Sequence, residues 1–273
     1  MQLMHNMYSL KVYNNYKKSV SDITKRTQNI SSGKKISSAK DDPKKIGQLD
    51  KLKISLSSRS QAEQNVQDVN SMIQTYDGAL QETNNSINRL KELVTQAGNN
   101  TYSDGDREAL QKEIDELKSS INDLANNTSY NGIQLSQSNG TTRKANVGEL
   151  AGESIDIPYF DVSTTGLNLD NIDITTSSNV DNYLNEIDTA GATIASIRSK
   201  YGALETSLQD SLNNYDEMND TMQSNESDLE DADIASEYLS YSSSQMLMQA
   251  GISLMAQSNQ LPQDCLNLLV TSL

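Results

Sequence analysis

Residues 66–97 read VQDVNSMIQTYDGALQETNNSINRLKELVTQA and decide the fold. Ten positions in this stretch recur at alternating spacings of three and four residues: Val66, Val69, Ile73, Tyr76, Leu80, Thr83, Ile87, Leu90, Val94 and Ala97. Such a heptad seam is typical of a long helix that packs against other helices. Asp42-Pro43 predicts the start of this helix and Gly98 its end. At 1.5 Å per residue, a helix from Pro43 would be about 80 Å long.

Two further seams are predicted in the middle of the chain. One covers 110–124, behind Ser103, which reads as a helix N-cap with Asp106 three residues on. The other covers 187–222. A seam is buried only against another helix that carries one, so we expect 66–97, 110–124 and 187–222 to form an antiparallel bundle.

The two ends of the chain carry seams of their own. The first covers 3–30 and is expected to end at Gly33, and the last covers 234–269, broken by Pro262. The acidic stretch 225–233 is expected to interrupt the helix before it. Two paired amphipathic helices make only a thin core. We therefore expect the ends to stay loosely ordered in the monomer and to pack against neighbouring subunits.

A small β region is predicted between the helical halves. Residues 154–157 and 171–175 alternate polar and apolar side chains, the two-residue period of half-buried strands. The predicted fold is mainly α: a long antiparallel coiled-coil bundle with a small β-hairpin region inserted between the N- and C-terminal halves. Two domains are expected. One is formed by the terminal helices, at 1–42 with 225–273, and the other by the helical bundle, at 43–132 with 181–224, together with its β region at 133–180.

Composition excludes several classes of protein. Residues 1–60 carry 13 Lys/Arg against 4 Asp/Glu, a net charge of +9, and the remainder carries −24, for −15 overall. The basic residues are scattered without an aromatic stacking platform, so nucleic-acid binding is not expected. No apolar run approaches the ~18–20 residues of a membrane span, and the start lacks the pattern of a cleaved signal peptide. Taken alone, these features suggest the cytosol.

Catalytic, metal and cofactor sites are not expected either. The sole histidine, His5, has no nucleophile or ligand set nearby in the sequence, and the acidic run 226–237 lacks the spacing of a calcium loop. The glycines form no phosphate-binding loop. The single cysteine, Cys265, allows no disulfide within the chain and is expected to pack as a small apolar residue.

Several motifs, in order along nearly the whole chain, are similar to those of bacterial flagellins. They are Ser31-Ser32-Gly33-Lys34-Lys35-Ile36, Asn65-Val66-Gln67-Asp68, Asp77-Gly78-Ala79-Leu80, Asn126-Asn127-Thr128-Ser129-Tyr130-Asn131-Gly132, Ser227-Asp228-Leu229-Glu230-Asp231-Ala232-Asp233 and Ala256-Gln257-Ser258-Asn259-Gln260. The middle of the chain leaves no room for outer variable domains, so the chain resembles a short flagellin. This chain departs from the usual flagellin pattern at Cys265 and in the extension 270–273.

The resemblance implies a structural filament subunit for motility. It implies export through the flagellar secretion channel without a cleaved signal peptide, and an extracellular place in the filament. The implied partners are other copies of the chain, the export machinery with a chaperone for the C-terminal segment, and the filament cap and hook-junction proteins. No nucleic acid or membrane insertion is implied.

The resemblance also implies two sets of site residues. Burial among neighbouring subunits is expected for Val20, Ile23, Ile30, Ile252, Met255 and Leu266. A patch similar to the one recognised by the vertebrate Toll-like receptor for flagellin comprises Asn88, Arg89, Leu93 and Glu113. Arg89 and Leu93 are four residues apart and are expected to share a helix face. The alternative is an ordinary solvated face.

Two other functions stay open at this point. One is a junction protein between hook and filament, and the other is a coiled-coil secreted or adhesive protein.

Overall fold

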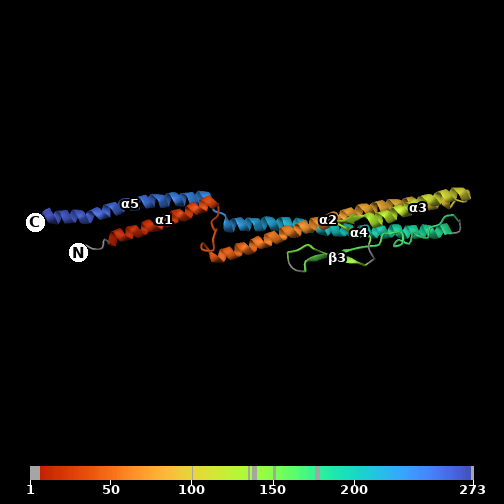
Figure 1. The fold of residues 1–273 in the computed structure, drawn as a ribbon, viewed down its shortest axis with the longest axis horizontal. Coiled ribbons are helices and arrows are strands. Elements are labelled where there is room, and N and C mark those ends of the chain that lie inside the picture. Colours follow the sequence, from red (N-terminus) through yellow and green to blue (C-terminus); the bar gives the residue numbers. More distant parts are fainter. Residues whose placement is uncertain are drawn as a thin grey trace. The chain divides into compact units, whose positions relative to one another are not determined.

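The computed structural model describes residues 7–99, 101–134, 136, 140–149, 152–175 and 179–271, with side chains as far as residue 260. The described residues form two compact units, Met1–Leu56 with Asp220–Leu273 and Ser57–Asn219. The helices are α1 (Met7–Ser32), α2 (Pro43–Ala97), α3 (Asp104–Asn127), α4 (Val180–Glu230) and α5 (Ile234–Thr271), shown in Figure 1. This mainly α architecture with a small β region confirms the predicted fold class. The predicted division into a terminal domain and an inner domain that includes the β region stays a prediction.

Local sequence signals fix several helix ends. The Asp42 carboxylate accepts hydrogen bonds from the backbone N–H groups of Lys44 and Lys45 at 3.1 and 3.2 Å, as expected for a cap before Pro43. Ser103 and Asp106 form a capping box at the start of α3. Gly33 ends α1 at φ +70°, a conformation that glycine adopts without strain.

The core of the second unit is built from the predicted middle seams. All ten residues of the 66–97 seam are buried, and none is more than 9% exposed. They pack with Ile114 and Ile121 of α3 and with Ile187, Ile194 and Leu208 of α4. Burial of such side chains contributes roughly 1.5–3 kcal/mol each. The narrow seam therefore supplies a continuous core despite the low apolar content.

Polar pairs along α2 and α4 show that these two helices are antiparallel, and an ion pair also joins α2 to α3. Arg89 on α2 bonds Glu113 on α3 at 2.7 Å. Along α2 and α4, Lys91 pairs with Asp188, Asp77 with Arg198 and Glu63 with Asn219. Partner numbers on α4 rise as those on α2 fall, which is the expected antiparallel arrangement.

Two antiparallel hairpins form the β region. Strands β1 (Ser129–Tyr130) and β2 (Ile133–Gln134) are joined by Asn131-Gly132, both at positive φ, as a tight hairpin turn requires. Strands β3 (Thr142–Asn146) and β4 (Ser154–Pro158) pair with Ala145 opposite Ile155. The predicted strand at 154–157 is confirmed.

The predicted strand at 171–175 is wrong. Ile172 and Ile174 are buried and their neighbours exposed, so the alternation of burial is real. The segment lacks a strand partner among the described residues, and a helix side chain takes that place: Gln111 on α3 accepts from the Ile174 N–H at 2.8 Å and donates to the Ile172 carbonyl at 3.3 Å. A two-residue period reports an extended, half-buried backbone, but it does not report the presence of a neighbouring strand.

Three buried tyrosines tie the β region to the bundle. Tyr76 on α2 donates to the carbonyl of Ile133 at 3.1 Å, and Tyr201 on α4 donates to the carbonyl of Pro158 at 2.8 Å. The Tyr76 and Tyr159 rings meet edge to face at 6.0 Å. Burial raises the pKa of both Tyr76 and Tyr201 above the ordinary tyrosine value, so these hydroxyls stay neutral donors.

In the first unit, α1 and α5 lie side by side (Figure 1). The segments that lead into and out of them are joined by two backbone hydrogen bonds, Lys35 N–H to Glu230 O at 2.7 Å and Ala232 N–H to Gly33 O at 2.9 Å. The Glu230 carboxylate accepts from Lys34 at 2.5 Å and Lys53 at 2.7 Å. These contacts hold the pair of terminal helices together at one end.

The predicted interruption at 225–233 is present but shorter than expected, and the predicted helix end at Pro262 is wrong. Helix α4 runs through most of the acidic stretch 225–233 and stops only at Glu230, and α5 continues past Pro262 to Thr271. A proline removes one helix hydrogen bond and disturbs one carbonyl, but the bonds on either side can hold the helix. Among the described residues, no helix has both the length and the apolar character needed to span a bilayer.

Candidate functional site

The first unit has little apolar core. Among the residues whose side chains are described, its buried hydrophobic side chains are Ile36 and Leu49, whereas the second unit buries all the other core residues. The residues buried on α1 and α5 are instead small or polar: Ser19 and Asn29 on α1, and Gly251 and Ser258 on α5. This is the thin core expected for the ends of the chain.

Polar contacts fix how α1 lies on α5. Arg26 bonds both oxygens of Glu237 at 2.8 and 2.9 Å, and Asn29 donates to the same carboxylate at 3.2 Å. Gly251 lies against Tyr16, where a Cβ would make ordinary van der Waals contact at 3.7 Å with the Tyr16 Cβ. Few apolar side chains are therefore buried in the contact between α1 and α5.

Large apolar side chains instead point away from the helix pair. On α1 and α5 the exposed ones are Met7, Tyr8, Leu10, Tyr13, Val20, Ile234, Tyr238, Leu239, Met246, Leu247, Ile252 and Leu254, with exposed fractions of 36–73%. A set of this size on two adjacent helices is unusual for a monomeric protein and marks an interaction surface. We call these twelve residues the terminal apolar surface.

The predicted assembly residues are distributed over this helix pair. Val20 is 36% and Ile252 48% exposed, and Ile23, Ile30 and Met255 are half-buried. The Leu266 side chain, like that of Cys265, lies outside the described residues. All five described residues keep accessible surface after α1 and α5 pair, so they are available to a partner.

The terminal apolar surface is wider than the sequence indicated. Leu239, Leu247 and Leu254 do not belong to the three-and-four seam of the last helix, yet each is at least 45% exposed. The adjacent pairs Tyr238-Leu239 and Met246-Leu247 were the signal for this, because two neighbouring apolar residues lie about 100° apart on a helix and widen its apolar stripe.

The second predicted patch lies on the bundle. The exposed Arg89 guanidinium donates to Glu92 at 2.9 Å and to Glu113 at 2.7 and 3.1 Å, and these hydrogen bonds, that to Glu113 first, raise its pKa further above the usual arginine range. Asn88 is exposed beside it. Leu93 is 1% exposed and belongs to the bundle core, so its expected place on a shared surface with Arg89 is wrong. The patch that the structure presents is Asn88, Arg89 and Glu113.

The part of the chain with described side chains offers no metal site. Clusters of three or more His, Cys, Asp or Glu that could hold a metal ion are absent there. Asp170 accepts hydrogen bonds from Thr164 and Thr165 in the loop after β4, and these bonds lower its pKa.

Two sequence families match this chain. The profile of the bacterial flagellin N-terminal helical region matches residues 3–141, and that of the bacterial flagellin C-terminal helical region matches residues 184–269. The flagellin of Halalkalibacterium halodurans is 31% identical over 98% of this chain and 100% of its own length. The flagellin of Bacillus subtilis is 29% identical over the same shares of both chains.

Solved structures agree. A crystal structure of Bacillus cereus flagellin superposes with a TM-score of 0.51 and 27% identity, covering 56% of this chain and 88% of that one. A putative flagellar hook-associated protein from Vibrio parahaemolyticus has a TM-score of 0.61 at 17% identity, covering 70% of this chain and all of the other. At that identity the second likeness concerns the fold alone.

Proposed function

This chain belongs to the bacterial flagellin family and is a structural subunit of the flagellar filament; from that premise we propose that the terminal apolar surface of α1 and α5 is the surface through which copies of the chain polymerise. Neighbouring subunits would cover this surface, which includes Val20 and Ile252, together with Ile23, Ile30, Met255 and Leu266 on the same helices.

The exposure of this surface carries the proposal. The bundle buries its seam completely, whereas the terminal helices leave large side chains such as Met7 and Leu239 more than 70% exposed. Covering apolar surface yields about 25 cal/mol per Å², so leaving it in water is unfavourable unless a partner covers it. Other copies of the chain are the partner that the flagellin family implies.

Charge substitutions in the terminal apolar surface test this proposal. Val20→Glu and Ile252→Glu should each prevent or strongly reduce seeded filament growth, followed by sedimentation and electron microscopy, because a charge would be buried on assembly. Gln81→Glu, at an exposed position of α2 in the bundle, is the matched control and should assemble like the parent chain. Normal filaments from both Val20→Glu and Ile252→Glu would refute the proposed surface.

The thin core of the first unit supports export in an unfolded state. Because Ile36 and Leu49 are the only buried hydrophobic residues among its described side chains, this unit has little hydrophobic free energy to resist unfolding. The subunit would pass unfolded through the flagellar secretion channel to the extracellular filament, with a chaperone on its C-terminal segment, and meet the junction and cap proteins there. Retention of the chain inside cells that lack the flagellar export gate tests the route; undiminished secretion from such cells contradicts it.

A second proposed role is recognition by the flagellin-sensing Toll-like receptor of a host. Asn88, Arg89 and Glu113 support it, because the charged group is exposed and Glu113 holds the Arg89 fork in one position. An arginine held in this way is a common anchor of protein interfaces. Receptor signalling by monomers with Arg89 replaced is the measurement that decides this role.

A further inference from the structure

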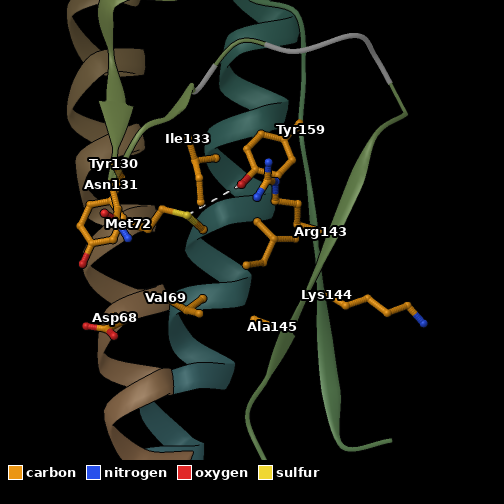
Figure 2. A pocket seen from close by; sticks show the side chains of 11 residues that line it. Asp68, Val69, Met72, Tyr130, Asn131, Ile133, Arg143, Lys144, Ala145 and Tyr159 are labelled. Atoms are coloured by element: carbon orange, nitrogen blue, oxygen red, sulfur yellow. Dashed lines mark hydrogen bonds between the residues drawn. The ribbon is translucent and has the colours of Figure 1, made fainter.

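The second unit contains a pocket of about 550 Å³ between α2 and the two hairpins (Figure 2). Its lining is mixed: the apolar and aromatic residues are Val69, Met72, Tyr130, Ile133, Ala145, Ile157 and Tyr159, and the polar or charged ones are Asp68, Asn131, Arg143 and Lys144. The Tyr159 hydroxyl donates to the Met72 sulfur at 3.8 Å, which joins two sides of the pocket. A volume of this kind lies within the range of roughly 300–1,000 Å³ that holds a ligand or a few side chains of a partner.

Arg143 on β3 sets this pocket apart. The other arginines of the chain all have partners: Arg26 with Glu237, Arg59 with Glu149, Arg89 with Glu113, Arg198 with Asp77, and Arg107 with the carbonyl of Asn99. Among the described residues, Arg143 has neither an ion pair nor a hydrogen bond. Its five N–H donors are thus available to an incoming anion.

Strand register directs Arg143 toward the pocket. Arg143 lies opposite Ile157, which is 2% exposed, whereas Lys144 lies opposite Asp156 on the other face of the hairpin. In the view of Figure 2 the Arg143 guanidinium overlaps the Tyr159 ring, and the amino end of Lys144, which also lines the pocket, extends away. Asp68 lines the pocket from α2 on the far side, so the β3 side is the favourable position for a carboxylate.

The chain itself offers the complementary chemistry. Residues 61–273 carry 33 Asp/Glu against 9 Lys/Arg, so its surface presents carboxylates widely. We propose that this pocket binds an acidic segment of a second copy of the chain, with a carboxylate paired to Arg143 and an adjacent apolar side chain against Met72 and Ile157. The inference rests on the proposed polymerisation and names one contact outside the terminal helices.

Two neighbouring charge reversals test this contact. Arg143→Glu and Lys144→Glu change the net charge equally and lie on the same strand; both residues line the pocket, but only Arg143 lies on the strand face of the buried Ile157. The assay is the critical concentration for seeded filament growth at about 50 mM salt, with folding checked by circular dichroism. Arg143→Glu should raise the critical concentration by about five-fold or more over Lys144→Glu, with the difference shrinking at about 500 mM salt as screening increases.

The outcomes separate this inference from the polymerisation that it assumes. Equal critical concentrations for the two variants, whether normal or raised, would overturn the pocket contact and leave assembly through the terminal helices standing. Failure of the parent chain to grow on seeds would instead remove the proposed polymerisation, and the pocket contact with it. If Arg143→Glu unfolds, Arg143→Gln against Lys144→Gln serves as the milder pair with the same criterion.

Discussion

Arg89 and Leu93 lie one turn apart on α2, yet the Arg89 side chain is exposed and bonded to Glu113 while Leu93 is 1% exposed in the bundle core. The two positions therefore report on different properties. Leu93→Ala should destabilise the protein by about 2–5 kcal/mol, because it leaves a cavity among α2, α3 and α4. Arg89→Ala should leave the urea unfolding midpoint close to that of the parent chain.

Receptor signalling separates the same two variants. If Arg89 is an anchor, Arg89→Ala monomers should lose potency without any loss of stability. Leu93→Ala should lose potency only in proportion to its unfolded fraction, so added stabilising osmolyte should restore it. Unchanged potency of Arg89→Ala in a cell reporter assay would remove the proposed receptor role.

The pair Asp77–Arg198 joins α2 to α4 by two hydrogen bonds of 2.7 and 3.0 Å. Both side chains are about one-third exposed, so solvent screens the pair despite its bidentate geometry. A double-mutant cycle of Asp77→Ala and Arg198→Ala, followed by urea unfolding, should give a coupling energy of about 1 kcal/mol or less. A coupling above about 2 kcal/mol would mean that the pair is far less solvated than its exposure indicates.

Gly33 and Gly47 should respond in opposite directions to alanine. Gly33 sits at φ +70° after α1, so Gly33→Ala should destabilise the first unit by about 1 kcal/mol. Gly47 lies inside α2 with open space around it, so Gly47→Ala should stabilise by roughly 0.5–1 kcal/mol. Thermal unfolding followed by circular dichroism checks both, and a stabilised Gly33→Ala would contradict the capping role of that residue.

Glu230 should make the stability of the first unit depend on acid. Hydrogen bonds from Lys34 and Lys53 lower the pKa of this carboxyl below its ordinary value of 4.5. A carboxyl whose pKa is lower in the folded than in the unfolded state stabilises the fold above the unfolded value, and this contribution is lost as pH falls through the folded value. Glu230→Gln should therefore lower the unfolding midpoint at pH 7 and have little effect near pH 2.

The matched control for that experiment is Asp50→Asn, an exposed carboxylate on α2 in the same unit for which the described residues provide no ion pair. It should change the midpoint little at either pH. Equal pH dependence of the parent chain and Glu230→Gln would show that the contacts of Lys34 and Lys53 with Glu230 contribute no stability.

The bundle could be predicted from the sequence because local and tertiary requirements coincide there. Each seam position from Val66 to Ala97 serves a single helix face, and the caps at Asp42, Ser103 and Gly33 act within three residues along the chain. Periodicity and capping are short-range properties, so the helices, their antiparallel order and the buried face follow from the residues themselves. The family also follows from the motifs in their order.

Contacts between residues distant in sequence decided the remainder. The 171–175 segment is extended, but its polar partner is Gln111 on α3, which no local pattern predicts. Leu93 shares a turn with Arg89 but faces the core, because the side on which α3 and α4 pack determines which side of α2 is covered. Likewise, whether Arg143 has an ion-pair partner depends on which side chains folding brings near it. The sequence determined the helices and their seams; only the tertiary structure decided which apolar residues remain exposed and which charges remain unpaired, because burial and pairing depend on neighbours brought together by folding.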